Sequence, residues 1–228
     1  MIYSSLKDFL CKLRQNCLLL ARHGETDWNA MGLIQGQQDR PLSSTGFLQR
    51  KNLFFHLRSV PLVKIYTSAL QRTIQTAQPL SDEKKIPLTI TPALNEAKLG
   101  VFEGEHKVNF SDDYSAKLYK EFLQDEINVI LPGGGENLKI VYDRIQKPLQ
   151  EILLSVTEKG HVLVVSHRNI NKMQIKCLLG LDFKAGYRVE HKNNWLYIFA
   201  PHRREIYLMK IKSPIGDVEI VPGYEEIA

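Results

Sequence analysis

The sequence predicts an α/β fold: a three-layer sandwich with a mostly parallel central sheet and helices on both faces. Two observations lead to this expectation. Short apolar runs typical of buried strands alternate along the chain with helical patterns. Two of these runs end abruptly in histidine and arginine, as Arg22-His23 and as His167-Arg168. In open parallel sheets, ligands bind where the strands end.

Composition limits the classes of protein to which the chain can belong. Its 228 residues are 43% hydrophobic and 24% charged, which is typical of a globular domain. The net charge of +5 is spread over dispersed residues, so a solvated surface is expected and a nucleic-acid partner is not. No apolar run reaches the roughly 18 residues that span a bilayer. Cys11, Cys17 and Cys177 form no CxxC pair, so neither a zinc site nor a disulfide framework is expected. A reducing, cytoplasmic location is therefore expected.

The chain ends are expected to differ from the main domain. Residues 1–14 follow the spacing of an amphipathic helix, through Leu6, Phe9, Leu10 and Leu13. We expect this helix to pack on the domain surface; binding to a membrane surface or to a partner is the alternative. The predicted division is an N-terminal helical extension at 1–16, the main domain at 17–212 and a tail at 213–228.

The main domain is expected to alternate strands and helices. Strands are predicted at 17–21, 62–67, 88–90 and 161–166, with closing strands at 195–199 and 205–211. Helices are predicted at 47–57 after an N-cap at Ser43 or Ser44, at 69–80, near 114–123, at 137–156 and at 169–179. Pro148 is expected to kink or end its helix. Gly133 to Gly135 is a flexible break and not a Walker loop, because no Gly-Lys-Ser/Thr follows.

Charged and titratable residues gather where these strands end. The first strand delivers Arg22 and His23, and the strand at 161–166 delivers His167. Arg72 lies early in the helix after the 62–67 strand, and Glu96 follows the 88–90 strand. Guanidinium groups suit phosphoryl oxygens, and histidine and glutamate can transfer protons. The remaining histidines fit no motif and are expected to be surface or local structural residues: His56, His106, His161, His191 and His202.

The run from Ala21 to Asn29, Ala-Arg-His-Gly-Glu-Thr-Asp-Trp-Asn, resembles the signature of the histidine phosphatase superfamily, the phosphoglycerate-mutase-like fold. Further resemblances follow in the family's order and cover about residues 17 to 210. They are Gln35-Gly36-Gln37-Gln38-Asp39-Arg40-Pro41-Leu42-Ser43, Thr67 to Ala77 around Arg72, Leu94-Asn95-Glu96 with Gly100 to Gly104, Gly134-Gly135-Glu136-Asn137, and Val164-Val165-Ser166-His167.

The resemblance implies a phosphomonoester hydrolase and a role for each matched residue. His23 would be the nucleophile that becomes phosphohistidine, oriented by the carbonyl of Gly24. Glu96 would protonate the leaving oxygen and then activate water. The phosphoryl oxygens would be bound by Arg22, Arg72 and His167, with Asn29, Gln35 and Gly36 completing the pocket. No metal or other cofactor is expected, because these side chains supply the positive charge.

The sequence departs from the family pattern in two places. Arg168 stands where the family usually has glycine, and it either adds a cation at the pocket rim or turns outward. Our hypothesis is that Arg168 selects more acidic, multiply phosphorylated substrates. Glu96 is followed by Ala97 to Gly100 and not by a mutase-like Arg-His-Tyr-Gly run, which favours hydrolysis.

Two alternatives remain at this point: a cofactor-dependent phosphoglycerate-type mutase, and a weakly active regulatory or binding protein on the same fold. A small phosphorylated molecule is the expected substrate rather than a phosphoprotein. No firm membrane association is expected, and the sequence does not reveal the oligomeric state.

Overall fold

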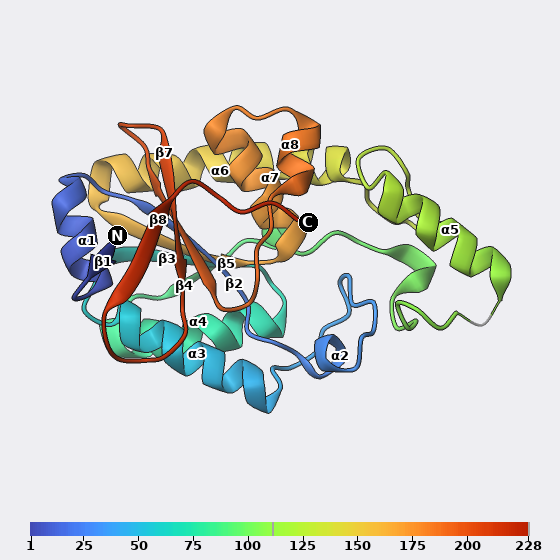
Figure 1. The fold of residues 1–228 in the computed structure, drawn as a ribbon, viewed down its shortest axis with the longest axis horizontal. Helices are drawn as coiled ribbons and strands as arrows, with labels where there is room; N and C mark the ends of the chain where they lie inside the picture. Colours follow the sequence, from blue (N-terminus) through green and yellow to red (C-terminus); the bar gives the residue numbers. More distant parts are fainter. Residues whose placement is uncertain (111, 228) are drawn as a thin grey trace.

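The apolar runs of the sequence form an eight-stranded sheet in the computed structural model, which describes residues 1–110 and 112–227 (Figure 1). The strand order is β1-β8-β7-β6-β2-β5-β3-β4. The bounds are β1 (Ile2–Tyr3), β2 (Leu18–Arg22), β3 (Leu62–Thr67), β4 (Leu88–Ile90), β5 (His161–Ser166), β6 (Trp195–Ala200), β7 (Glu205–Lys210) and β8 (Val218–Pro222).

The centre of the sheet is parallel, as the sequence predicts. Strands β2, β5, β3 and β4 all pair in parallel. The strands from β6 to β1 join the other side of β2 through antiparallel pairs. The carboxyl ends of the parallel strands therefore share one edge, where the candidate site residues follow.

Helices cover both faces of this sheet (Figure 1). Leu19 and Ala21 of β2 pack with α1, α3 and α4, whereas Leu18 and Leu20 pack with α6 and α7. This alternation follows from the two-residue period of a strand. The fold class is thus confirmed as a three-layer α/β sandwich. The bounds of the helices are α1 (Leu6–Leu13), α2 (Asp27–Ala30), α3 (Ser44–Leu57), α4 (Gln71–Lys84), α5 (Asp113–Gln124), α6 (Leu138–Lys159), α7 (Arg168–Leu179) and α8 (Phe183–Arg188).

Helix α5 lies apart from the sheet, at the end of the molecule opposite α1 (Figure 1). A small third apolar cluster holds it there, made of Ile34, Phe102, Tyr119, Phe122 and Leu131. Two short 3₁₀ turns, η1 (Pro92–Leu94) and η2 (Gly100–Phe102), lie in the chain between β4 and α5. Ile34, Tyr119 and Phe122 of this cluster also line the cavity that contains His23.

The two chain ends pair with each other in the sheet. Residues 1–14 were expected to form one helix, but they begin as strand β1. This strand pairs with β8, which lies in the segment 213–228 that was expected to be a tail. The apolar residues of α1 are buried in the core, as expected for a helix that packs on the domain. Both end segments thus contribute to one sheet, and the division at residues 16 and 212 stays a prediction.

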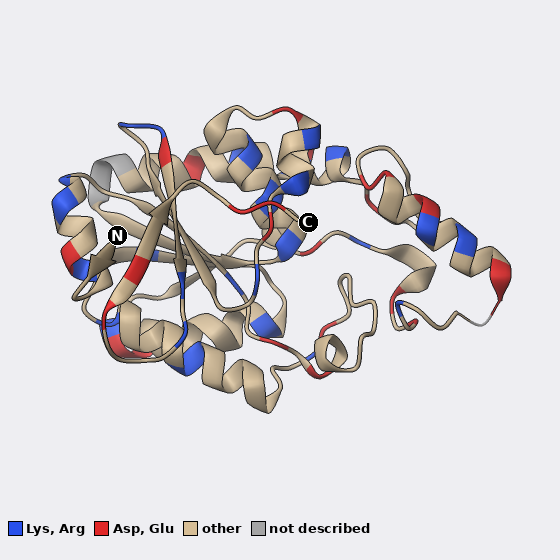
Figure 2. Ribbon diagram, in the orientation of Figure 1, with Lys and Arg blue, Asp and Glu red and all other residues tan. Residues whose placement is uncertain are grey.

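Other differences from the expected elements are local. Pro148 does not end its helix, because α6 continues to Lys159. Helices α2 and α8 and strands β1 and β8 were not predicted. Lys and Arg are spread over many elements and interspersed with Asp and Glu (Figure 2). Within the described residues, no helix is both long and apolar enough to cross a membrane.

Candidate active site

The two candidate histidines lie side by side because β2 and β5 pair in parallel. Arg22 at the end of β2 lies opposite Ser166 at the end of β5. The backbone N–H of His23 donates to the carbonyl of Ser166 at 3.0 Å, just beyond this pair. The ring centroids of His23 and His167 are 5.1 Å apart. The strand register therefore fixes the distance between the two imidazoles.

The ring of His23 is held in one orientation. It is 3% exposed, and its Nδ1 lies 2.7 Å from the carbonyl oxygen of Gly24. This is the contact expected of Gly24. Since a carbonyl can only accept, Nδ1 carries the proton and Nε2 keeps its lone pair. Burial, with the nearby Arg72 and Arg22, holds the pKa of His23 well below its ordinary value. The ring is thus neutral, with the lone pair of Nε2 available.

Arg72 joins His167 to the loop around Gly36. Its Nε donates to Nδ1 of His167 at 3.2 Å, so the remaining ring nitrogen, Nε2, carries the proton and faces Ser68 Oγ at 2.8 Å. Its terminal nitrogens donate to the carbonyls of Gln38 and Gly36, at 2.9 and 2.8 Å. Burial and then Arg72 lower the pKa of His167, so this ring is also neutral. Burial lowers the pKa of Arg72 to about 10, which leaves it charged at neutral pH.

The loop around Gly36 is fixed by polar contacts. Gln35 Oε1 accepts from Thr26 Oγ1 at 2.9 Å and from Asn29 Nδ2 at 3.2 Å. Gly36 has a φ of 51°, and a Cβ added there would overlap the carboxylate of Glu103. That carboxylate accepts from the N–H of Gln37 at 3.0 Å. The loop therefore requires glycine at position 36 on two separate grounds.

The segment from Glu190 to Asn193 supports the first strand end, and sequence reasoning missed it. The carbonyl of His191 accepts from Arg22 Nη1 at 3.0 Å, and Asn193 Nδ2 donates to the carbonyl of His23 at 2.7 Å. Of the two roles expected for His191, surface or local structural, it has the second: it is fully buried, with Nε2 3.0 Å from the carbonyl of Trp195. Only a local run of polar residues between α8 and β6 marked this segment in the sequence.

Arg168 points to the rim of the site and not outward. Its Nε lies 3.2 Å from the carboxylate of Glu190, and it lines the same cavity as His23. The departure from the family's glycine therefore adds a cation that an adjacent carboxylate partly compensates.

Glu96 faces this cavity from the loop between η1 and η2. It is partly exposed, its Oε1 accepts from the N–H of Ala97 at 2.9 Å, and its Oε2 lies 3.5 Å from the N–H of Asn169. One carboxylate thus lines the same cavity as the ring of His23.

A single cavity of about 130 Å³ brings the predicted residues together. His167 lies behind it, in contact with Arg72, and Gly24 acts through its carbonyl. The predicted residues that line the cavity are Arg22, His23, Asn29, Gln35, Gly36, Arg72, Glu96 and Arg168. Two buried donors there, Arg22 Nε and Gln35 Nε2, have no protein partner. Unpaired buried donors beside cations are suited to an anion. No group of three or more His, Cys, Asp or Glu in the described part of the chain is placed to hold a metal.

Replacing Gly36 with alanine should disrupt the anion site. We expect Gly36→Ala to lower the free energy of unfolding by about 1–3 kcal/mol, because a side chain is strained at positive φ and meets Glu103. Binding of inorganic phosphate, measured calorimetrically, should weaken at least tenfold. Gly134→Ala is the control, since its φ is also positive, at 79°, and a Cβ there has open space. Equal losses in both variants would contradict the role of the Glu103 contact.

The buried histidines should make stability depend on pH. Burial lowers the pKa of His191 from 6.5 to about 3, so the folded chain keeps this ring neutral where the unfolded chain protonates it. The free energy of unfolding should therefore fall as pH drops below about 6.5. From about pH 7.5 to about pH 5, His191 alone accounts for about 2 kcal/mol of that fall.

Urea unfolding of His191→Gln at the two pH values checks this. The variant should lose about 2 kcal/mol less than the wild type on acidification. Exposed His202→Gln serves as the control and should keep the wild-type dependence. An unchanged dependence in His191→Gln would show that His191 does not contribute.

Comparison with known proteins agrees with this geometry. Residues 18–213 match the histidine phosphatase superfamily (branch 1). A probable phosphoglycerate mutase GpmB of Enterobacter sp. (strain 638) is 31% identical over 174 residues, covering 76% of this chain and 80% of that protein. An adenosylcobalamin/alpha-ribazole phosphatase of Salmonella typhimurium is also 31% identical, over 76% of this chain and 85% of that protein.

Solved structures share the fold. A mycobacterial glucosyl-3-phosphoglycerate phosphatase in its native state superimposes with a TM-score of 0.72 at 21% identity, over 94% of this chain and 100% of that one. A putative alpha-ribazole-5′-P phosphatase of Escherichia coli gives a TM-score of 0.70 at 24% identity, over 94% and 99%. The matched family spans the whole site, and the chain therefore belongs to the histidine phosphatase superfamily, branch 1.

Proposed function

We propose that the protein hydrolyses small phosphomonoesters through a phosphohistidine at Nε2 of His23. In the first step the Nε2 lone pair attacks phosphorus, the phosphorus–oxygen bond to the alcohol breaks, and Glu96 gives its proton to the departing oxygen. In the second step Glu96 takes a proton from water, the resulting hydroxide attacks phosphorus, and the phosphorus–nitrogen bond breaks. Phosphate leaves, and His23 and Glu96 return to their starting forms.

The observation that carries this proposal is the hydrogen bond between His23 Nδ1 and the carbonyl of Gly24. It leaves Nε2 as the lone-pair nitrogen of a buried ring in the cavity that Glu96 also lines. Arg22 and Arg72, with Asn29, Gln35 and Gly36, would bind the transferring oxygens. His167 has both ring nitrogens engaged, with Arg72 and Ser68, so we propose that it acts on the phosphoryl group through Arg72.

Hydrolysis is favoured over the two alternatives. The relatives include proteins named as mutases and as phosphatases, so their names do not separate the reactions. The Ala97-Lys98-Leu99-Gly100 run after Glu96 supports hydrolysis over the mutase reaction. A weakly active binding protein is disfavoured because the nucleophile, the carboxylate and both arginines all line the cavity. A cytoplasmic location and the absence of a nucleic-acid partner stay predictions.

The phosphoenzyme tests the proposed function directly. Wild-type protein quenched during turnover of p-nitrophenyl phosphate should carry an acid-labile phosphoryl group, at a stoichiometry approaching one. His23→Ala should lose that label and about 10³-fold or more of kcat/KM, because the nucleophile is gone. Excess chelator should leave the wild-type rate unchanged, since the arginines supply the charge. A label that persists in His23→Ala would refute the mechanism, as would phosphate transfer to a second acceptor without release of inorganic phosphate.

Arg168 is proposed to favour substrates with a second anionic group. Its Nε and Nη2 pair with Glu190, so we propose that Nη1 is the nitrogen that binds the second anionic group. In Arg168→Gly, kcat/KM for a sugar bisphosphate should fall about tenfold more than kcat/KM for the matching monophosphate. Arg188→Gln serves as the control. It breaks the ion pair with Glu226, and Arg188 is not among the residues that line the cavity. An unchanged ratio between the two substrates in Arg168→Gly would disprove this preference.

A further inference from the structure

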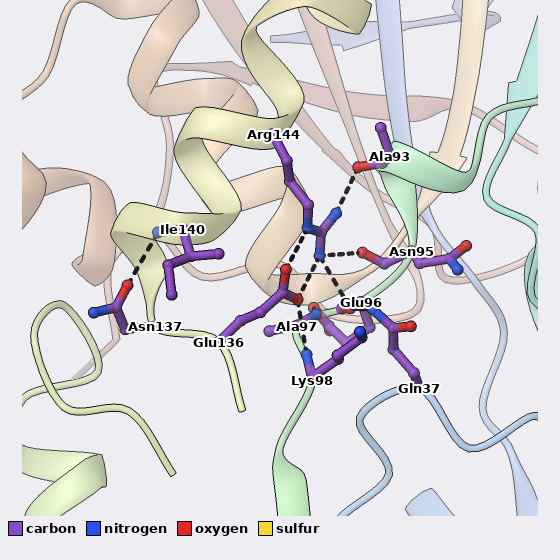
Figure 3. A network of polar contacts seen from close by, with 10 residues as sticks. All are labelled: Gln37, Ala93, Asn95, Glu96, Ala97, Lys98, Glu136, Asn137, Ile140 and Arg144. Atoms are coloured by element: carbon purple, nitrogen blue, oxygen red, sulfur yellow. Dashed lines mark hydrogen bonds and ion pairs between the residues drawn. The ribbon is translucent and has the colours of Figure 1, made fainter. Parts of the chain in front are cut away.

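The guanidinium of Arg144, on α6, points at the loop that carries Glu96 (Figure 3). Its Nη1 donates to the carbonyl of Ala93 at 2.5 Å. Its Nη2 donates to the carbonyls of Asn95 and Glu96, at 2.7 and 3.1 Å. Three carbonyls of one loop therefore converge on a single side chain from another element.

Glu136 fixes the position of Arg144. Its two carboxylate oxygens lie 2.8 Å from Nε and 3.0 Å from Nη2 of the guanidinium. The side chains of Arg144 and Glu136 are only 21% and 12% exposed, so solvent competes weakly for this ion pair. A bidentate pair with little exposure sets both the place and the plane of the guanidinium.

Glu136 also ties down the far end of the same loop. Its Oε2 accepts from the N–H of Lys98 at 3.0 Å, and its own N–H donates to the carbonyl of Lys98 at 2.8 Å. On the opposite side, Gln37 Nε2 donates to the carbonyl of Glu96 at 2.8 Å. The main chain from Ala93 to Lys98 is therefore held at both ends and in the middle (Figure 3).

None of these contacts involves the carboxylate of Glu96. Its oxygens have the N–H groups of Ala97 and Asn169 as partners, and both groups are main chain. The clamp thus restrains where the carboxylate can reach without taking its lone pairs. General acid catalysis needs a donor–acceptor distance of about 2.6–3.2 Å, and an error of about 1 Å can cost roughly 10²-fold in rate.

We infer that Arg144 and Glu136 form a positioning pair that sets the reach of Glu96 to the leaving-group oxygen. The inference rests on the proposed function, in which Glu96 is the proton donor. A purely structural ion pair would instead affect every substrate alike. The pKa of His167 is lowered first by burial and then by neighbouring side chains, of which Arg72 contributes most and Arg144 contributes less. That second effect would act on phosphoryl transfer in general and would not distinguish one leaving group from another.

The dependence of rate on the leaving group separates these cases. A nitrophenolate leaves without a proton, whereas the alkoxide of glycerol 2-phosphate needs one. For Arg144→Met, kcat/KM on p-nitrophenyl phosphate should fall less than about threefold, and kcat/KM on glycerol 2-phosphate should fall about 30- to 100-fold. Glu136→Gln should give the same pattern to a smaller degree. Arg144→Lys should recover part of the loss, because one ammonium can serve some but not all of the carbonyls.

Glu96→Gln provides the reference and separates two kinds of failure. It should show the same selective loss, and adding Arg144→Met to it should cause no further selective loss, because both changes act on one step. If Glu96→Gln shows the selective loss but Arg144→Met loses activity equally on both substrates, the inference about Arg144 is wrong and the proposed role of Glu96 stands. No selectivity in Glu96→Gln would overturn the proposed role of Glu96 itself.

Two controls address folding. Arg188→Gln breaks a more exposed ion pair, with Glu226, and should change the rate on neither substrate. Unfolding curves of the Arg144 and Glu136 variants identify any that are not folded at the assay temperature. Glu136→Gln keeps the shape of the side chain, so it tests the inference if Arg144→Met fails to fold. Equal loss on the two substrates in folded Glu136→Gln would overturn the inference as well.

Discussion

Parallel pairing of β2 with β5 places Arg22 opposite Ser166, and the site follows from that register. The chain leaves both strands at the same level, so His23 and His167 meet with their rings 5.1 Å apart. Side chains alternate between the two faces of a strand, so slipping the register by one residue would turn the buried leucines of β2 to the wrong layers. The apolar packing that holds the register therefore also holds the catalytic geometry.

Burial lowers the pKa of both the histidines and the arginines of the site, yet it leaves the two kinds of side chain in different charge states at neutral pH. It lowers the pKa of His23 and His167, whose neutral forms are the ones that the chemistry and the hydrogen bonds require. It also lowers the pKa of Arg22 and Arg72, but only to about 10, so both remain cationic. One desolvated pocket thus combines a neutral nucleophile with positive charge. The burial of both arginines carries a desolvation cost, which the phosphoryl dianion of the proposed substrate would offset.

Sequence was sufficient where structure depends on local pattern. Strands β3, β4 and β5 have the predicted bounds. The signal is clearest for β5, whose six residues are all buried and mostly apolar, as in a strand with both faces covered. Strands β1 and β8 were missed because one has two residues and the other lies in a polar segment. The helix through Pro148 was predicted to kink or end; it does not end there, and its apolar residues pack on the sheet along its length. The supports at Arg144 and at Glu190 to Asn193 bind main-chain groups far away in sequence, and no residue pattern reveals such contacts.

Arg168 shows how a departure from the family pattern is accommodated. Its backbone is not among those with positive φ in the described residues, so position 168 does not require the freedom of glycine. The side chain turns to Glu190, whose neighbour His191 holds Arg22 through its carbonyl. The new cation is therefore attached to the segment that already supports the first strand end. Because Glu190 compensates part of its charge, the cation that we propose to favour anionic substrates adds less than a full positive charge beside Arg22.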